Sequence, residues 1–281
     1  MIKTICVCGA GTMGSGIAQV AARAGFTTIQ FDVNSTILQK SRQAIQESLQ
    51  YLCEKQKISS EEKAGTLERI HFTSDYSDCI ADLVIEAIIE EPAAKTALFN
   101  QLAGINTTDT IFASNTSSLS ITALQENLPD PGRFAGLHFF NPAPVMKLVE
   151  IIKGKWTTEH VIRELNQLCL QLGKTPVHCS DSPGFIVNRV ARPYYLEAMH
   201  LLNENVAGME AIDRIMEATG FKMGPFKLMD LIGIDINYHV SEIVYEALGK
   251  PSRLQPSVIQ KEKLVTGKLG RKTGEGFYKY P

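Results

Sequence analysis

Short apolar runs alternate with longer stretches of helical hydrophobic spacing through the first half of the chain. Strand-like runs cover residues 2–8, 27–33, 81–89 and 110–115, and helical patterns cover 15–25, 34–56 and 91–103. Pro92 fits the first turn of the last of these helices, where its missing N–H costs nothing. Strand and helix in regular alternation predict a parallel, doubly wound sheet of the Rossmann type.

Two further apolar runs, 133–140 and 147–153, follow with only a short link between them. A parallel crossover needs about a dozen residues, so we expect these two runs to pair antiparallel at one side of the sheet. The predicted fold class of this part of the chain is therefore α/β, with a mostly parallel sheet and an antiparallel edge.

The pattern changes at Ser182-Pro183-Gly184. Residues 184–204, 208–220, 234–249 and 256–267 show helical periodicity, and no convincing strand pattern follows residue 184. We therefore expect two domains, an α/β domain over residues 1–183 and an all-α domain over 184–281.

Composition narrows the class of protein. The 281 residues include 28 basic and 30 acidic side chains, a net charge of −2, which argues against nucleic acid or an acidic membrane as a partner. A spanning helix needs about 18 consecutive apolar residues, and none is found. The six cysteines do not resemble a disulfide framework, and the N-terminal residues do not resemble a signal peptide. We expect a cytoplasmic protein.

A glycine-rich turn joins the first strand to the first helix. Gly9, Gly11 and Gly14 fit G-x-G-x-x-G, with Thr12 and Met13 between the second and third glycines. In this context the glycines allow a tight turn, close approach to a pyrophosphate and close helix packing. Asp32 ends the second strand, where an acid can bind an adenosine ribose and repel a 2′-phosphate, which favours NAD over NADP. The alternative is that Asp32 only begins a turn.

His138 and Glu150 stand on either side of the segment NPAPV. His138 lies six residues before Pro144 and Glu150 six residues after it, so a hairpin centred there would make them cross-strand neighbours on one face. A carboxylate on one imidazole nitrogen fixes the tautomer and leaves the other nitrogen to take a proton. The alternative is a half-buried structural histidine and a solvent-facing glutamate.

Several long sequence words occur together in one order. They are GAGTMGSGIA, ASNTSSLSIT, GLHFFNPAPVMKLVE, DSPGFIVNRV, MGPFKLMDLIGID and GRKTGEGFYKY, from residue 9 to the C-terminus. In these words the chain resembles the L-3-hydroxyacyl-CoA dehydrogenase family, and most closely its short bacterial members that act on 3-hydroxybutyryl-CoA. The resemblance implies an NAD-dependent dehydrogenase of acyl-CoA substrates, with an NAD-binding domain and a helical domain through which two copies form a homodimer.

The resemblance also implies site residues. His138 is implied as the general base and Glu150 as its partner, with Ser117 and Asn188 around the reacting substrate. Implied contacts to NAD are Glu90, Lys95, Ser117, Asn141 and Lys272, and implied contacts to coenzyme A are Ser48, Lys55 and again Ser117. Each has an ordinary alternative: Ser117 could cap a turn, Asn188 could be a routine helix residue, and the three lysines could be solvated.

Two other functions remain open at this point. A β-hydroxyacid dehydrogenase with a lysine base shares the glycine loop, but the helix after residue 184 begins with Asn188 and Arg189 and has no lysine there. A dinucleotide-binding protein without catalysis is the other. The remaining histidines show no ligand spacing with Cys or acidic residues, so no metal is implied.

Overall fold

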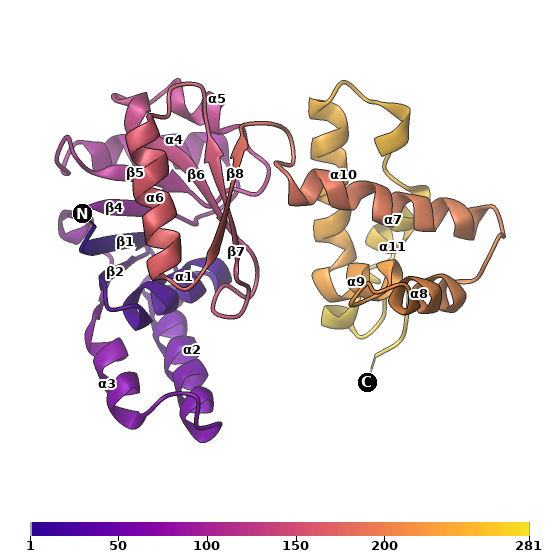
Figure 1. The fold of residues 1–281 in the computed structure, drawn as a ribbon, viewed down its shortest axis with the longest axis horizontal. Helices are drawn as coiled ribbons and strands as arrows, with labels where there is room; N and C mark the ends of the chain where they lie inside the picture. The colour runs from indigo at the N-terminus through magenta and orange to yellow at the C-terminus, as the bar shows by residue number, and fades with distance from the viewer. Residues whose placement is uncertain (1, 281) are drawn as a thin grey trace. The chain divides into compact units, whose positions relative to one another are not determined.

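An eight-stranded sheet organises residues Met1–Asp181, the first of the two compact units into which the chain divides (Figure 1). The computed structural model describes residues 2–280. The strands are β1 (Thr4–Cys8), β2 (Thr27–Phe31), β3 (Ile70–Thr73), β4 (Leu83–Glu86), β5 (Ile111–Ser114), β6 (Phe134–Phe139), β7 (Leu148–Lys153) and β8 (Thr175–Ser180).

The strand order is β3-β2-β1-β4-β5-β6-β7-β8. All neighbours pair parallel except β6 and β7, which pair antiparallel, so β7 and β8 run against the other six strands. Because the chain leaves β1 toward β2 on one side and later returns to β4 on the other, the order reverses at β1. The predicted doubly wound sheet with an antiparallel edge is confirmed.

Helices cover both faces of this sheet (Figure 1). They are α1 (Thr12–Arg23), α2 (Ser35–Glu54), α3 (Ser60–Glu68), α4 (Pro92–Ala103), α5 (Ile121–Gln125) and α6 (Glu159–Gln171), with short 3-10 turns η1 (Tyr76–Asp78) and η2 (Pro131–Arg133). Apolar side chains of α1 and α6 share a core with Ala113. The next side chain back, Phe112, points to the other face and packs edge-on against Phe99 of α4, with ring centroids 6.0 Å apart.

Five helices and strands of this unit lie outside the predicted ones: α3, β3, α5, α6 and β8. β3 is only four residues long, and β8 is half-exposed with mixed polar and apolar residues, so neither has the apolar run of a buried strand. β8 pairs with β7 and completes the edge that we assigned to the hairpin alone. α3 packs with α2 over a small core that includes Ile45, Leu49 and Ile58.

The second unit, Ser182–Pro281, is helical. Its helices are α7 (Val187–Asn203), α8 (Met209–Ala218), α9 (Pro225–Ile232), α10 (Ile234–Ala247) and α11 (Val258–Val265), with 3-10 turns η3 (Ser252–Leu254) and η4 (Arg271–Thr273). In its described residues the pairing of extended backbone is limited to isolated bridges at Glu275, so the predicted all-α character is confirmed. Within residues 2–280, no helix is long and apolar enough to cross a bilayer.

A buried carboxylate fastens the C-terminal tail to this unit. Asp230, in α9, is 1% exposed and accepts hydrogen bonds from the backbone N–H groups of Phe277 and Tyr278 at 2.8 and 2.9 Å. The hydroxyl of Tyr280 donates a third bond at 2.9 Å. Phe277 thereby stays packed edge-on against Phe226, with ring centroids 4.9 Å apart.

We expect Asp230→Asn to destabilise the helical unit by about 2–4 kcal/mol, because the amide loses the charge and turns one N–H group toward a buried donor. Urea unfolding followed by circular dichroism measures the change. Glu204→Gln, at an exposed carboxylate just after α7, is the control and should leave the unfolding midpoint in place. Equal stability of Asp230→Asn and wild type would contradict this account of the tail.

Candidate functional site

The polar loops of the first unit gather at one edge of the sheet. The first six strands in chain order run parallel, so the loops that follow their carboxyl ends emerge on the same side. These loops hold the glycine turn after β1, Asp32 after β2, Glu90 after β4 and Ser117 after β5. His138 is the penultimate residue of β6 and Asn141 follows that strand. The reversal of strand order at β1 falls at this edge, where ligands of such sheets bind.

Each of the three glycines in the turn is required or tolerated for a different structural reason. Gly9 has φ +100°, and a side chain there would also collide with the Ala87 carbonyl oxygen. A side chain at Gly14 would collide with the Gly9 carbonyl oxygen, so only glycine lets α1 begin this close to β1. Gly11, the N-cap of α1, has no atom within 4 Å of an added Cβ. The turn is therefore tight at two glycines and open at the third.

Asp32, which directly follows β2, contacts the glycine turn. Its Oδ2 accepts from the Ala10 N–H at 2.8 Å and its Oδ1 from the Asn34 N–H at 2.9 Å. A carboxylate offers roughly four acceptor sites, so two backbone bonds leave capacity for the hydroxyls of a ribose. Asp32 therefore does more than begin a turn, because it also holds the glycine loop.

A cavity of about 380 Å³ opens beside the turn. It is lined from α1 by Gly11 and Thr12, from α2 by Lys40, and from the loop after β6 by Asn141 and Pro144. The N-terminus of α1 and the basic side chain of Lys40 give this lining a positive potential. Open space at Gly11 together with the Asp32 carboxylate fits a nucleotide with a pyrophosphate and a free ribose.

His138 and Glu150 pair directly across the antiparallel strands. The register of β6 and β7 places the two residues opposite each other, as the symmetry about Pro144 predicted. His138 Nδ1 lies 2.7 Å from Glu150 Oε2, and the two residues are 5% and 1% exposed. A buried carboxylate at that distance holds the proton on Nδ1, which leaves Nε2 as the ring nitrogen that can accept one. Glu150 therefore does not face solvent, and the role of His138 as a base stays a prediction.

Two side chains that sequence reasoning missed hold this hairpin in place. Asn115 Oδ1 accepts from the Phe139 N–H at 2.8 Å and ties the loop after β5 to the end of β6. Lys174 donates from Nζ to the carbonyl oxygens of Ala143 and Met146, at 2.5 and 2.8 Å. Burial lowers the pKa of Lys174. A lysine directly after a helix-ending glycine is usually a surface residue. The contacts of Lys174 with the hairpin loop could therefore not be predicted from the sequence.

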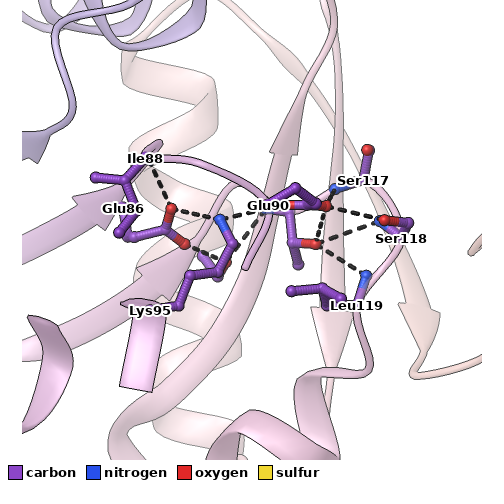
Figure 2. A network of polar contacts seen from close by, with 9 residues as sticks. Glu86, Ile88, Glu90, Lys95, Ser117, Ser118 and Leu119 are labelled. Atoms are coloured by element: carbon purple, nitrogen blue, oxygen red, sulfur yellow. Dashed lines mark hydrogen bonds and ion pairs between the residues drawn. The ribbon is translucent and has the colours of Figure 1, made fainter. Parts of the chain in front are cut away.

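A charged cluster lies after β4 (Figure 2). Lys95 is 1% exposed, and its Nζ lies 2.5 Å from Glu86 Oε1 and 3.1 Å from Glu90 Oε2. Glu90 Oε1 in turn accepts from Thr116 Oγ1 at 2.5 Å and from the Ser117 N–H at 3.0 Å. Lys95 is thus a buried ion-pair partner, and the alternative of a solvated surface lysine is wrong for it.

The other residues singled out from the sequence belong to α2, the residue that follows it, and the helical unit. Ser48, on α2, accepts from Gln19 Nε2 at 3.0 Å, and Lys55, just after α2, lies over the ring of Tyr51. In the helical unit, Asn188 is in the first turn of α7 and Lys272 Nζ lies 2.6 Å from Asp235 Oδ2. Among the described residues, no group of His, Cys, Asp and Glu has the arrangement of a metal site.

Comparison with known proteins places the chain in a family. Residues 4–182 match the model of the 3-hydroxyacyl-CoA dehydrogenase NAD-binding domain, and residues 184–280 match the model of the 3-hydroxyacyl-CoA dehydrogenase C-terminal domain. The chain therefore belongs to the 3-hydroxyacyl-CoA dehydrogenase family. It is an oxidoreductase of that family, with a nicotinamide-dinucleotide-binding domain, and the resemblance drawn from its sequence words is confirmed.

Individual relatives cover the whole chain. The 3-hydroxyadipyl-CoA dehydrogenase of Escherichia coli is 46% identical over 99% of this chain, which spans only 59% of that relative's length. A probable 3-hydroxybutyryl-CoA dehydrogenase of Deinococcus radiodurans is 44% identical over 98% of this chain and 99% of its own length. The crystal structure of (S)-3-hydroxybutyryl-CoA dehydrogenase from Ralstonia eutropha matches with a TM-score of 0.96 at 40% identity, covering 100% of both chains.

The glycine turn yields a paired prediction. We expect Gly11→Ala to leave the unfolding temperature unchanged, because its Cβ enters open space. The same Cβ would stand where a pyrophosphate approaches the backbone, so NADH should bind at least about tenfold more weakly. Gly14→Ala should instead lower the unfolding temperature. Fluorescence titration of NADH and a thermal melt distinguish the two, and unchanged NADH affinity in Gly11→Ala would place the pyrophosphate elsewhere.

Proposed function

We propose that this protein catalyses the reversible, NAD-dependent oxidation of (3S)-3-hydroxyacyl-CoA to 3-oxoacyl-CoA. The observation that carries the proposal is the buried contact of 2.7 Å between His138 and Glu150 at the carboxyl edge of a nicotinamide-dinucleotide-binding domain. A substrate alcohol must lose a proton as its carbon loses hydride, and this pair supplies a base of the right kind beside the expected cofactor.

His138 takes the hydroxyl proton on Nε2. Glu150, fixed on Nδ1, stabilises the imidazolium that forms, so the proton can be returned when the reaction runs backward. Bound NAD supplies the hydride acceptor. The low exposure of both side chains strengthens their mutual attraction and limits competition from water.

The remaining site residues divide by the group that they contact in this proposal. Ser117 and Asn188 orient the reacting oxygen or the thioester carbonyl, as a hydroxyl and an amide can. Gly9, Gly11, Thr12, Met13, Gly14 and Asp32 hold the adenosine and pyrophosphate. Glu90, Ser117, Asn141 and Lys272 contact the nicotinamide side, where the buried Lys95 acts through its ion pair with Glu90. Ser48, Lys55 and Ser117 contact coenzyme A. Ser48 lies on α2 and Lys55 directly follows the end of that helix, and a lysine suits a phosphate.

Asp32 supports NAD in preference to NADP. Its carboxylate is fixed by two backbone N–H groups where the adenosine ribose is expected, and a 2′-phosphate there would meet a negative charge. Lys40, which lines the cavity, carries a positive charge that would favour a 2′-phosphate and so opposes this effect. Comparison of NADH and NADPH dissociation constants tests this preference directly.

A four-carbon acyl chain is the proposed substrate, because two relatives that match over nearly their full length are named for 3-hydroxybutyryl-CoA. The E. coli relative named for 3-hydroxyadipyl-CoA makes a longer dicarboxylic substrate the second candidate. The proposed location is the cytoplasm.

The central test is NADH oxidation with 3-oxoacyl-CoAs of increasing length, in wild type and His138→Gln. The variant should turn over about 10²–10⁴-fold more slowly, since it loses the acid–base group. Its NADH affinity should stay nearly unchanged. His160→Gln, at an exposed histidine in α6, is the matched control and should keep wild-type turnover.

Three outcomes would count against the proposal. Wild-type turnover in His138→Gln would remove the base assignment. Activity on free 3-hydroxy acids rather than on acyl-CoAs would favour the lysine-base class of dehydrogenase. Tight NADH binding with no turnover on any acyl-CoA would indicate a dinucleotide-binding protein without catalysis.

We further propose that two copies form a homodimer through the helical domain, taken as residues 184–281 beside an NAD-binding domain of 1–183. Large exposed apolar side chains are frequent in that domain, among them Val190, Phe221, Val258 and Val265. A monomer gains little from such exposure. Light scattering after size exclusion should give the mass of two chains, and Val190→Asp with Val258→Asp should lower it, whereas a single-chain mass for wild type would contradict the proposal.

A further inference from the structure

We infer that Glu86 is a positioning residue for Ser117, through the cluster of Glu86, Lys95, Glu90, Ser114 and Thr116. The inference rests on the proposed function only for the role of Ser117. Glu86 is the last residue of β4 and Ser114 the last residue of β5, which are paired with one another in the sheet. Both side chains are fully buried.

The Glu86 carboxylate acts only as an acceptor. Its Oε1 receives the Ile88 N–H at 2.7 Å and the Lys95 ammonium at 2.5 Å, and its Oε2 receives the Ser114 hydroxyl at 2.6 Å (Figure 2). Both oxygens are therefore used, by donors from the loop after β4, the helix α4 and the strand β5. The ionised carboxylate accepts from all three groups as they stand, whereas an amide places an N–H group opposite one of them or requires the Ser114 hydroxyl to rotate.

Two hydrogen-bonded routes lead from Glu86 to the turn that holds Ser117. In the first, the Ser114 hydroxyl that donates to Glu86 accepts from the Thr116 N–H at 3.2 Å. In the second, Lys95 bridges Glu86 to Glu90, whose Oε1 accepts from Thr116 Oγ1 and the Ser117 N–H. Glu86 thus lies at the origin of both routes and reaches no polar atom of the turn itself.

The turn is closed by the same atoms. Thr116 Oγ1 donates to Glu90 and accepts from the Ser118 and Leu119 N–H groups, at 3.3 and 2.9 Å. Ser118 Oγ donates to Glu90 Oε1 at 3.0 Å. Glu90 Oε1 thus binds Thr116, Ser117 and Ser118 together. A shift of Glu90 would therefore move the backbone of Ser117 and of its neighbours on both sides.

The pKa values of the two glutamates in the cluster shift in opposite directions. Burial raises the pKa of Glu86, against the opposing charge and hydrogen bond of Lys95. Burial also raises the pKa of Glu90, but the charge of Lys95 and hydrogen bonds from Thr116 and Ser118 outweigh it, so the pKa of Glu90 lies below its usual range. Removing the Glu86 charge leaves Lys95 buried with Glu90 alone, which draws Glu90 toward Lys95 and away from the turn.

The test is a double-mutant cycle on the full chain with Glu86→Gln and Ser117→Ala. Glu86→Gln should lower kcat about 10–10²-fold through misplacement of Ser117, with the KM for acyl-CoA changed far less. In the Ser117→Ala background, the same substitution should lower kcat by less than about 3-fold, because coupled residues are not additive. Glu91→Gln, at an exposed carboxylate next to Glu90, is the control and should change kcat by less than about 2-fold.

Additive losses in the cycle would overturn the inference, since a merely structural role of Glu86 would cost the same with or without the Ser117 hydroxyl. If Glu86→Gln does not fold, Ser114→Ala breaks one route while leaving the ion pairs, and the same non-additivity with Ser117→Ala is expected. NADH affinity, measured by fluorescence, gives a second cycle without turnover. If the wild type binds NADH but turns over no acyl-CoA, the proposed function is contradicted. If the losses of NADH affinity in the double-mutant cycle are additive, this inference is contradicted.

Discussion

A charge buried without a partner costs several kcal/mol, and this chain buries two carboxyl groups in the strands of its sheet. Glu86 ends β4, Glu150 lies within β7, and neither is more than 1% exposed. Glu86 has the Lys95 ammonium at 2.5 Å, and Glu150 has the His138 imidazole at 2.7 Å. Lys95 lies in α4 and His138 in β6, so these contacts hold a helix and a neighbouring strand against the two carboxylates. Glu86 also accepts the Ile88 N–H, which ties the loop after β4 to the end of that strand.

Hydrogen bonds from side chains to backbone atoms explain why the site can be rigid although it is built from loops. Asn115 ties the loop after β5 to β6, Lys174 ties the loop after β6 to the start of β8, and Asp32 ties the glycine turn to β2. All three contacts join a side chain to backbone atoms of a neighbouring segment. A loop held in this way keeps its position without apolar packing of its own, and it can therefore stay accessible to a ligand.

Much of this arrangement could be predicted from the sequence, because its strongest signals are local or regular. Long apolar runs marked β4 and β6, the glycines marked the nucleotide turn, and equal spacing about Pro144 gave the register of His138 and Glu150. α6 also has a readable apolar spacing at Val161, Leu165 and Leu168, although we did not predict it. The functional roles assigned to the site residues, His138 and Glu150 included, stay predictions.

The burial of Lys95 and the brace from Lys174 could not be predicted in the same way. Whether a lysine is solvated or buried depends on which acceptors the fold brings to it, and Ser114 and Glu86 meet only because β4 and β5 are neighbours in the sheet. The half-exposed β8 was missed for a related reason: an edge strand is defined by its neighbour rather than by its own side chains.

The hairpin between β6 and β7 has a consequence for how this chain can change over time. Side chains on a strand alternate between faces, so a single-residue slip of β7 would turn Glu150 away from His138 and expose the opposite row to the core. Insertions or deletions near this hairpin are therefore tolerated only where the loop can accommodate them without altering the strand pairing. Lys174 restrains that loop, because it binds two of its carbonyl oxygens. Loop length here should drift far more slowly than side-chain identity.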